Sequence, residues 1–479
     1  MPVSANPNAV ESPIASRAMT LALGAWVATG VLLRSYALWS QPTPMLWFDT
    51  GTYLRGSLPG AAPALDRPLG YSWFLRGVRM LHPGLPIVQI VQMVLGIATA
   101  WLFFAVVRRL MPKSAFVSTT VFGLLLVWPT SVILETYVLS DTLFLFFAGL
   151  GFYFHVRASA SERTFPASCL LLGGAAFAAG ALVRLAGIYF CLAFPLIMGV
   201  LAFKSDYAHR REVRRAFLAS ARTMGWVALP ILLTLGLYAS HYEKHHGVFA
   251  LQSWSGIDRY STVARLIEPE VAGSDHALET FLRSHAEGHQ RDFGFIMWDE
   301  RSPLAAAARE FSLDPPALNR WADTIAWATV ARRPTDAFTL WGRQFVSAFL
   351  VVDPLDRQIV IQSSLTVYRW VLATHHVDSS RWDSSHSFRL RWLLALYRVK
   401  PMLGAGLLAA LAMAATRRFR HVHQVFFALN ALGFTAAVAM SIQPEQRHVH
   451  IVEVMLIVSF VMSIGQCLQP LGVRDIGSR

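Results

Sequence analysis

Three carboxylates stand where they could do chemistry, because each lies at the end of an apolar run. Asp49 lies in "MLWFDTGTYL", residues 45–54, among aromatic side chains. Glu135 and Asp141 bracket a short turn in "PTSVILETYVLSDTLF", residues 129–144. Such a carboxylate can take the proton of a hydroxyl or bind a divalent cation. All three are therefore candidate catalytic residues, and Asp49 and Asp141 are candidate metal ligands.

Arginines accompany these acids in similar places. Arg67 follows Asp49 in the same polar stretch, Arg184 stands in "GALVRLAGIYF", and Arg447 stands in "QPEQRHVHIVE". A guanidinium stays charged and offers several N–H donors, so each is a candidate to bind a phosphate. Acids and arginines in such places could serve as a base and as binding groups for an anion.

The composition indicates that membrane-spanning helices position these residues. The chain has 479 residues, of which 54% are hydrophobic and only 15% charged, against roughly 25% charged in soluble proteins. Its net charge of +13 could suggest nucleic acid as a partner, but Lys and Arg lie mainly in short loops between apolar runs. We therefore expect an integral membrane protein with no nucleic-acid partner. The three cysteines lie inside apolar runs and predict no disulfide.

Apolar runs near the ~20 residues that a bilayer-crossing helix needs recur along the chain. The predicted spans are 18–38, 85–109, 115–134, 138–157, 166–183, 185–203, 223–240, 400–416, 422–441 and 449–468. An amphipathic run at 336–353 either lies in the interface or crosses, in which case the segment around 385–398 crosses back. The expected fold is an all-α polytopic membrane protein with about 10–12 transmembrane helices.

The basic loops predict the orientation. "RRLMPK" (108–113), residues 204–222 and "TRRFRHVH" (416–423) are the densest short basic loops, which face the cytoplasm in most membrane proteins. Both termini are then cytoplasmic, and the candidate acids and arginines gather on the opposite face. The basic, Ala- and Arg-rich style suggests a bacterial inner membrane, with the site facing the periplasm or exterior.

The same topology predicts the division of the chain. Residues 1–17 form a disordered cytoplasmic tail, and 18–240 form an N-terminal transmembrane module with a catalytic outer loop at 39–84. Residues 241–399 form a non-cytoplasmic, mostly helical loop domain, and 400–479 return to the membrane. Within the loop domain, 278–290 and 315–334 have helical spacing, and Pro315 and Pro316 suit a helix start.

Each candidate also has a structural interpretation. Arg34, near the outer end of the first span, is expected to extend its charge to the interface. Arg184 could be an interfacial anchor, and Glu135 and Asp141 could stabilise helix ends. Asp49 could cap a short interfacial helix.

Histidines near the outer face raise the question of a metal. His241 and His245 lie four residues apart, as on one helix face, whereas His448 and His450 lie two apart and suit a strand. Solvated interfacial histidines are the favoured interpretation, over a metal bound through histidines.

The order of these features resembles the GT-C class of membrane glycosyltransferases, nearest the branch of protein O-mannosyltransferases and lipid A aminoarabinose transferases. Asp49 matches the acid of the first outer loop, and Arg67-Pro68-Leu69-Gly70-Tyr71 is similar to an Arg-Pro-Pro-Gly-Tyr-like stretch. Ser140-Asp141-Thr142 is similar to a Ser-Glu-Thr-like step, Arg184-Leu185 to an Arg-Pro step, and Arg447-His448 to an Arg-Tyr step. The resemblance covers most of 18–460.

The chain departs from the class at three of these positions. Thr50 follows Asp49 where many members pair two acids, Leu185 replaces a proline, and His448 replaces a tyrosine. These departures bear on metal ligation and on the identity of the sugar.

The resemblance implies transfer of a sugar from a polyprenyl-phosphate donor to an acceptor hydroxyl at the non-cytoplasmic face. Asp49 would be the general base, with Asp141 and Glu135 as supporting groups that hold its partners or a divalent cation such as Mg²⁺ or Mn²⁺. The phosphate and sugar would be bound by residues of four motifs, namely Arg67, Tyr71, Arg184, Arg447 and His448.

The acceptor would be a glycan, a lipid or a protein. The 241–399 segment would cover the site and select it, with Trp254, Trp298 and Trp321 as candidate contacts, although core packing is the favoured role for any one of them. Two other functions remain open. A ligase or polymerase of lipid-linked glycans would also use outer-face arginines and histidines. A transporter or flippase would place charges at mid-membrane, with broken helices and paired repeats.

Overall fold

The computed structural model describes residues 13–42, 44–46, 48–112, 114–159, 165–291, 293–350, 435 and 450–467. Within these residues the structure is all-α, and its only extended pairing is an isolated bridge between Met45 and Tyr137. The predicted all-α polytopic membrane fold is confirmed. The predicted spans 400–416 and 422–441, and the loop domain beyond residue 350, lie outside the described residues.

Five of the described helices are long and apolar enough to cross a membrane. They are α1 (Pro13–Ser40), α4 (Pro86–Leu110), α7 (Asp141–Ser159), α9 (Ile188–Arg210) and α10 (Val213–His246). Two shorter apolar helices, α5 (Ala115–Val127) and α8 (Ala167–Val183), complete the bundle between them. Consecutive helices of the bundle alternate in direction. The last residues of α1 and α8 and the first residues of α4 and α7 therefore lie at the same end of the bundle.

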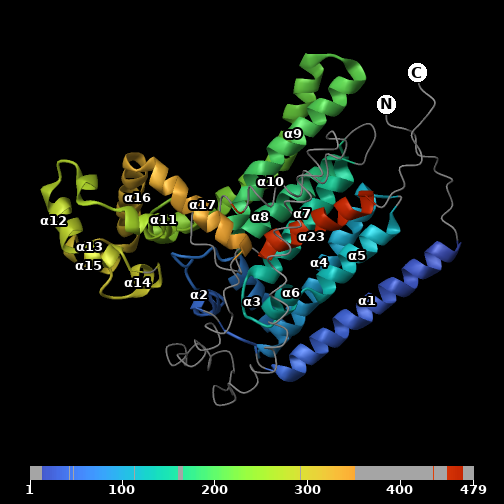
Figure 1. Cartoon of the computed structure of the whole chain (residues 1–479), viewed down its shortest axis with the longest axis horizontal. Helices are drawn as coiled ribbons and strands as arrows, with labels where there is room; N and C mark the ends of the chain where they lie inside the picture. Colours follow the sequence, from blue (N-terminus) through green and yellow to red (C-terminus); the bar gives the residue numbers. More distant parts are fainter. Residues whose placement is uncertain are drawn as a thin grey trace.

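The helices pack in a continuous layer (Figure 1). α4 packs against α5 and α7, α8 packs against α7 and α10, and α9 packs along α10, while α1 lies against α5 at the side. The last described helix, α23 (His450–Cys467), lies against α5 and α4. At Gly174 in α8, an added Cβ would stand 2.2 Å from the carbonyl oxygen of Val227 in α10. The close approach of α8 and α10 therefore requires glycine there.

The predicted span 115–134 is wrong in its second half. The helix α5 ends at Val127, and a separate short helix α6 (Pro129–Glu135) follows. Pro129 lacks an N–H and excludes the helical conformation from the residue before it, so Trp128 is extended (φ −63°, ψ 120°). The Trp128 Nε1 donates to a carboxylate oxygen of Glu453 in α23 (2.9 Å). Trp128, at the break between α5 and α6, therefore contacts α23 as well. The break also places Glu135 at the end of α6.

Other predicted boundaries shift by a few residues. The span predicted at 185–203 begins with a 3-10 turn, η1 (Leu185–Gly187), before α9, and the span predicted at 223–240 is only the middle of α10. The amphipathic run predicted at 336–353 forms α17 (Pro334–Leu350), which contacts α16 (Pro315–Arg332). α17 is not among the described helices that are long and apolar enough to cross.

Two short helices lie in the loop between α1 and α4. They are α2 (Phe48–Gly56) and α3 (Gly70–Leu81), which pack against each other, and α3 also contacts α8. An added Cβ at Gly70 would stand 2.5 Å from the carbonyl carbon and oxygen of Leu182. Gly70 thus lets the start of α3 lie directly on the end of α8, next to Arg184.

Residues 251–350 form a small helical unit beside the bundle, with its own core (Figure 1). Its elements are α11 (Ser255–Val263), η2 (Ala264–Leu266), η3 (Pro269–Ala272), α12 (His276–Ser284), α13 (Ala286–His289), α14 (Phe293–Trp298), α15 (Pro303–Glu310), α16 and α17. The ring of Trp321 contacts those of Tyr260 (5.6 Å between centroids) and Phe281 (5.8 Å), and Trp254 packs on the same core. Core packing is therefore the observed role of Trp254 and Trp321.

The two helical stretches predicted in this unit are confirmed, with one correction. α16 begins at Pro315 and Pro316, and the side chain of Asp314 accepts a hydrogen bond from the Ala317 N–H (2.7 Å), as a helix cap does. The stretch 278–290 is not one helix, because it breaks at His285 between α12 and α13.

Candidate active site

The loop between α1 and α4 is hydrogen-bonded to the turn between α6 and α7. The Met45 N–H donates to the carbonyl of Thr136 (2.8 Å), and the Val138 N–H donates back to the carbonyl of Met45 (2.9 Å). The Thr50 hydroxyl also donates to the carbonyl of Val138 (3.0 Å). These bonds join segments about 90 residues apart and hold the start of α2 beside the start of α7.

Asp49 lies in the first turn of α2 and binds Arg67. An oxygen of its carboxylate is 3.0 Å from an Nη of Arg67, and the Asp49 side chain is 10% exposed, against 27% for Arg67. Asp49 is the second residue of α2 and not the residue before it, so it is a first-turn acid with a specific partner and not the predicted cap. A charge-assisted bond of this kind fixes the carboxylate in one orientation.

The stretch that carries Arg67 is held from the other side by α10 and the residues after it. The His246 Nε2 donates to the carbonyl of Pro63 (2.8 Å), and the Ser253 N–H donates to the carbonyl of Leu65 (2.8 Å). The Tyr238 hydroxyl accepts from the Leu69 N–H (3.2 Å). The position of Arg67 therefore depends on contacts with residues about 170 to 190 positions further along the chain.

A second acid and arginine pair lies at the same end of the bundle. Asp141 begins α7 and forms an ion pair with an Nη of Arg184, the residue that follows α8. Both side chains are largely buried, so this pair is more than an anchor at the interface. The second carboxylate oxygen of Asp141 is buried and has no hydrogen-bond partner among the described residues. It is an available acceptor in the site.

Tyr53 lies between the two ion pairs. Its hydroxyl shares a hydrogen bond with the hydroxyl of Ser140 (3.0 Å), next to Asp141. Its pKa is raised by burial first and by the charge of Asp49 second, while the charges of Arg67 and Arg184 oppose that rise. The charges of Asp49, Arg67 and Arg184 therefore act on Tyr53, and its hydrogen-bond partner Ser140 directly precedes Asp141.

Tyr71, expected to bind substrate, is fully buried beneath Tyr53. Their rings meet edge to face at 4.8 Å, and the Tyr71 hydroxyl donates to Oε1 of Gln92 (2.6 Å). The Nε2 of Gln92 donates to the carbonyls of Glu135 (3.0 Å) and Tyr137 (2.6 Å). Gln92 thus ties α3, α4 and the turn after α6 together, and Tyr71 acts on the site through this support.

Two further carboxylates, Asp66 and Asp258, interact with the charge of Arg67, and neither was predicted from the sequence. Burial lowers the pKa of Arg67, but the charge interactions with Asp49, Tyr53, Asp66 and Asp258 outweigh it and raise that pKa above its usual value. Burial is the main cause that raises the pKa of Asp66, and it raises the pKa of Asp258 to about 7. Neighbouring negative charges add to both rises.

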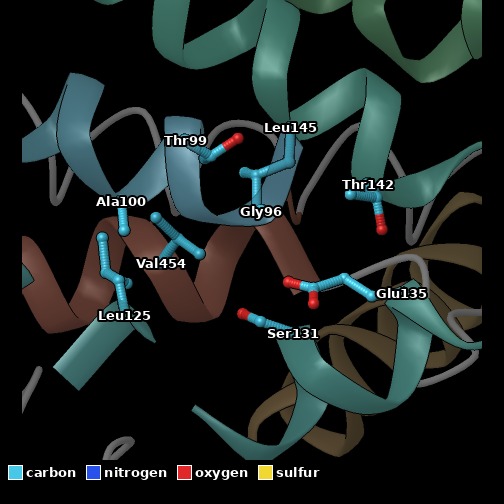
Figure 2. Close-up of a pocket in the computed structure, with 9 residues that line it drawn as sticks. All are labelled: Gly96, Thr99, Ala100, Leu125, Ser131, Glu135, Thr142, Leu145 and Val454. Carbon is cyan, nitrogen blue, oxygen red and sulfur yellow. The ribbon is translucent and has the colours of Figure 1, made fainter. Parts of the chain in front are cut away.

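Glu135 lies apart from this cluster. Its carboxylate pairs with Arg34 (2.6 Å) and points into a small cavity between α4, α5, α6, α7 and α23, lined also by Ser131 and Thr142 (Figure 2). An added Cβ at Gly96 would stand 1.8 Å from a carboxylate oxygen of Glu135, so α4 needs glycine where this side chain enters. The expectation that Arg34 extends to the interface is wrong, because its side chain is only 4% exposed.

The structure brings together Asp49, Arg67, Asp141 and Arg184, with Tyr71 beneath them. Arg447 and His448 lie outside the described residues. In the part of the chain that the structure describes, no group of three or more His, Cys, Asp or Glu could hold a metal ion. The rings of His241 and His245 do lie side by side on α10 (4.8 Å), as their spacing predicts.

Two signals in the sequence could have found the missed residues. Gln92 is a polar residue inside an apolar span, where polar side chains are costly and usually have a specific partner. Asp66 directly precedes Arg67. No signal of this kind marks Asp258, because its position depends on how the segment after α10 packs on the first loop.

The chain has a structural likeness to a solved protein but no match by sequence. No protein-family model matches the chain, and no curated protein matches it. Among solved structures, the chain is similar to the crystal structure of ArnT from Cupriavidus metallidurans bound to undecaprenyl phosphate, with 14% identity, a TM-score of 0.35, and coverage of 92% of this chain and 77% of that chain. At this TM-score the likeness assigns no role to any residue.

Proposed function

We propose that the chain is a membrane glycosyltransferase that moves a sugar from a polyprenyl-phosphate donor to an acceptor hydroxyl at the non-cytoplasmic face. One observation carries the proposal. The ion pairs Asp49–Arg67 and Asp141–Arg184 join residues from four segments at one end of the helices, and the charges of Asp49, Arg67 and Arg184 act on Tyr53. The resemblance of the sequence motifs to the GT-C class supports the same function.

The proposed reaction needs a base and a binding site for the leaving phosphate. Asp49 takes the proton of the acceptor hydroxyl as the new bond forms at the anomeric carbon, while the bond from that carbon to the phosphate oxygen breaks. The electron pair of that bond stays with the phosphate, which leaves as polyprenyl phosphate. Arg67 and Arg184 stabilise its negative charge with N–H donors that Asp49 and Asp141 do not occupy.

In this proposal Asp141 holds Arg184 in place, because an arginine fixed by one carboxylate needs no reorganisation to meet a phosphate. Glu135 supports the site from below, where its carbonyl accepts from Gln92. Arg447 and His448 remain proposed ligands of the donor. Asp49 and Asp141 are each engaged by an arginine, so the described acids do not form a cation site and no step is assigned to a metal.

The test is release of polyprenyl phosphate by purified full-length protein, supplied with a panel of lipid-linked monosaccharides and candidate acceptors. The variant Asp49→Asn is expected to abolish release while membrane expression and elution profile remain those of the wild type. Arg265→Gln, at an exposed position of η2, is the control and is expected to keep full activity. An Asp49→Asn protein with half the wild-type rate would remove Asp49 from the mechanism.

One feature favours a second function, that of a transporter or flippase. The break between α5 and α6 lies beside the buried pair of Arg34 and Glu135, and transporters often combine broken helices with buried charges. The same preparation in vesicles separates the two functions. Movement of the lipid-linked sugar across the bilayer without release of polyprenyl phosphate would identify the transporter.

A further inference from the structure

α9 and α10 form a hairpin that extends beyond the other helices, at the end of the bundle opposite the candidate active site (Figure 1). α10 has 34 residues, so it is about 51 Å long, whereas the hydrocarbon core of a bilayer is about 30 Å thick. The last turn of α10 is held at the site end, where the His246 Nε2 donates to the carbonyl of Pro63 (2.8 Å). The first turns of α10 therefore lie outside the hydrocarbon core, at the level of the headgroups of the opposite leaflet.

One side of this part of α10 is packed and the other side is exposed. Ala216, Thr223 and Val227 are buried on the side that packs against α8 and α9. Leu218 follows Ala216 by two residues and therefore points about 200° away around the helix, where it is 59% exposed. Phe217, beside it, is 65% exposed. Two large apolar side chains thus lie uncovered on the outward side of the hairpin.

Basic side chains flank these two apolar residues. Arg214 and Arg222 lie four residues before and four residues after Leu218, so the three side chains line one face of α10. Both arginines are exposed, as are Lys204 in α9 and Arg211 in the turn. Within the part of the chain that the structure describes, none of these four basic side chains forms an ion pair. Their charges are therefore available to a partner.

The exposed face of the hairpin continues into the apolar part of α10. Leu229 and Leu232 lie 11 and 14 residues after Leu218, which places them within about 40° of it around the helix, and both are exposed. In a membrane-spanning helix, exposed leucines on this face contact the acyl chains of lipid molecules. A lipid whose chains pack on Leu229 and Leu232 therefore has its headgroup near Arg222.

We propose that the face formed by Arg214, Phe217, Leu218 and Arg222 binds anionic phospholipids of the leaflet opposite the candidate active site. The guanidinium groups bind the lipid phosphates, while Phe217 and Leu218 enter the boundary between headgroups and acyl chains. A signal for membrane orientation requires positive charge but not large apolar side chains between the arginines. This binding surface does not depend on the proposed transferase function.

The net charge of the headgroup decides which lipid binds. Each Lys or Arg near an anionic surface strengthens binding about five-fold, and a zwitterionic headgroup provides no such gain. The test titrates phosphatidylglycerol or phosphatidylcholine into the purified full-length protein in neutral detergent and measures the rise in apparent Tm. We expect phosphatidylglycerol to stabilise the wild type at lower concentration than phosphatidylcholine. In the double variant Arg214→Gln/Arg222→Gln, the apparent Kd for phosphatidylglycerol should increase about 25-fold.

Three further variants separate charge, position and apolar contact. Arg265→Gln/Arg320→Gln removes two exposed charges from the helical unit of residues 251–350 and should keep the wild-type affinity. Arg214→Lys/Arg222→Lys keeps the charge in place and should keep most of the affinity. Leu218→Gln should weaken binding of the intact lipid. Glycerol phosphate, which lacks acyl chains, should not stabilise the protein at the same phosphate concentration.

Three results would overturn the proposal. One is equal affinity of the wild type and the Arg214→Gln/Arg222→Gln protein for phosphatidylglycerol. Another is equal stabilisation of the wild type by the two lipids, a comparison that needs no variant. The last is stabilisation by glycerol phosphate, which would identify a site for a free anion and not a lipid-binding surface.

Discussion

Arg34 and Glu135 form an ion pair between residues 101 positions apart, with an Nη to Oε1 distance of 2.6 Å and side chains only 4% and 1% exposed. Arg34 also donates to the carbonyl of Leu126 (2.8 Å). That carbonyl lies in the last turn of α5, where the break at Pro129 deprives carbonyls of their helical partners. Arg34 thus neutralises the charge of Glu135 and also donates a hydrogen bond to a carbonyl that the helix break leaves without a helical partner.

The first prediction follows from this pair. Glu135→Ala leaves Arg34 buried without its counter-ion, which typically costs 3–5 kcal/mol, so we expect a large fall in apparent Tm and in the yield of monodisperse protein. The matched control is the exposed pair of Arg215 and Glu212, whose side chains are 60% and 55% exposed. Glu212→Ala should cost about 0–1 kcal/mol. Equal effects of the two substitutions, measured by thermal unfolding in detergent, would contradict the importance of burial.

A second prediction concerns the space that Glu135 occupies. Gly96→Ala places a methyl group 1.8 Å from its carboxylate oxygen and 3.2 Å from an Nη of Arg34, so a side chain or α4 must shift. Overpacking of this kind costs about 1–3 kcal/mol, and we expect a lower apparent Tm. Gly236→Ala in α10 is the control, because nothing lies within 4 Å of the added group. It should be neutral or stabilising by up to about 1 kcal/mol through helix propensity.

The third prediction concerns pH. Asp258 has a pKa of about 7 in the folded protein, raised by burial first and also by Asp66 and Asp49, against the opposing charges of Arg67 and Arg259. The unfolded chain has the ordinary value near 4, so between about pH 4 and pH 7 only the folded state binds this proton. Stability from this group is therefore present at low pH and lost as pH rises through that window.

The variant Asp258→Asn removes this dependence. We expect its apparent Tm to exceed that of the wild type at pH 8, with the difference shrinking toward pH 4.5, in unfolding curves at several pH values. Asp299 gives the opposite sign, because the hydrogen bond from Arg301 lowers its pKa to about 2. Asp299→Asn should therefore give no gain in Tm at pH 8. A gain for Asp258→Asn that was the same at every pH would show that its charge is not the cause.

Parts of this site were predictable because they follow from the alternation of spans. Asp49, Asp141 and Arg184 each lie at the end of an apolar run, so helix direction alone places them at one end of the bundle. The partner of Arg34 was not predictable, since nothing local identifies an acid 101 residues away, and the favoured exposure of Arg34 was wrong for that reason. The break at Pro129 had a local signal, a proline within an apolar run, but the hydrophobicity of 115–134 concealed it. Asp258 depends wholly on tertiary packing.

The fourth prediction tests the sidedness on which the proposed function depends. Arg55→Cys places a thiol at an exposed position of α2, and Glu212→Cys places one at the exposed turn between α9 and α10. Because α10 crosses from that turn to the end of the bundle that carries the site, we expect a membrane-impermeant thiol reagent on intact cells to label residue 55 and not residue 212. Opened membranes should label both. The native Cys169 and Cys191 are buried, and the protein without either substitution measures the background from all three native cysteines. Labelling of both positions from outside would place the two ends of the bundle on one face, and the phosphate of an externally displayed donor could not then be assigned to Arg67 and Arg184.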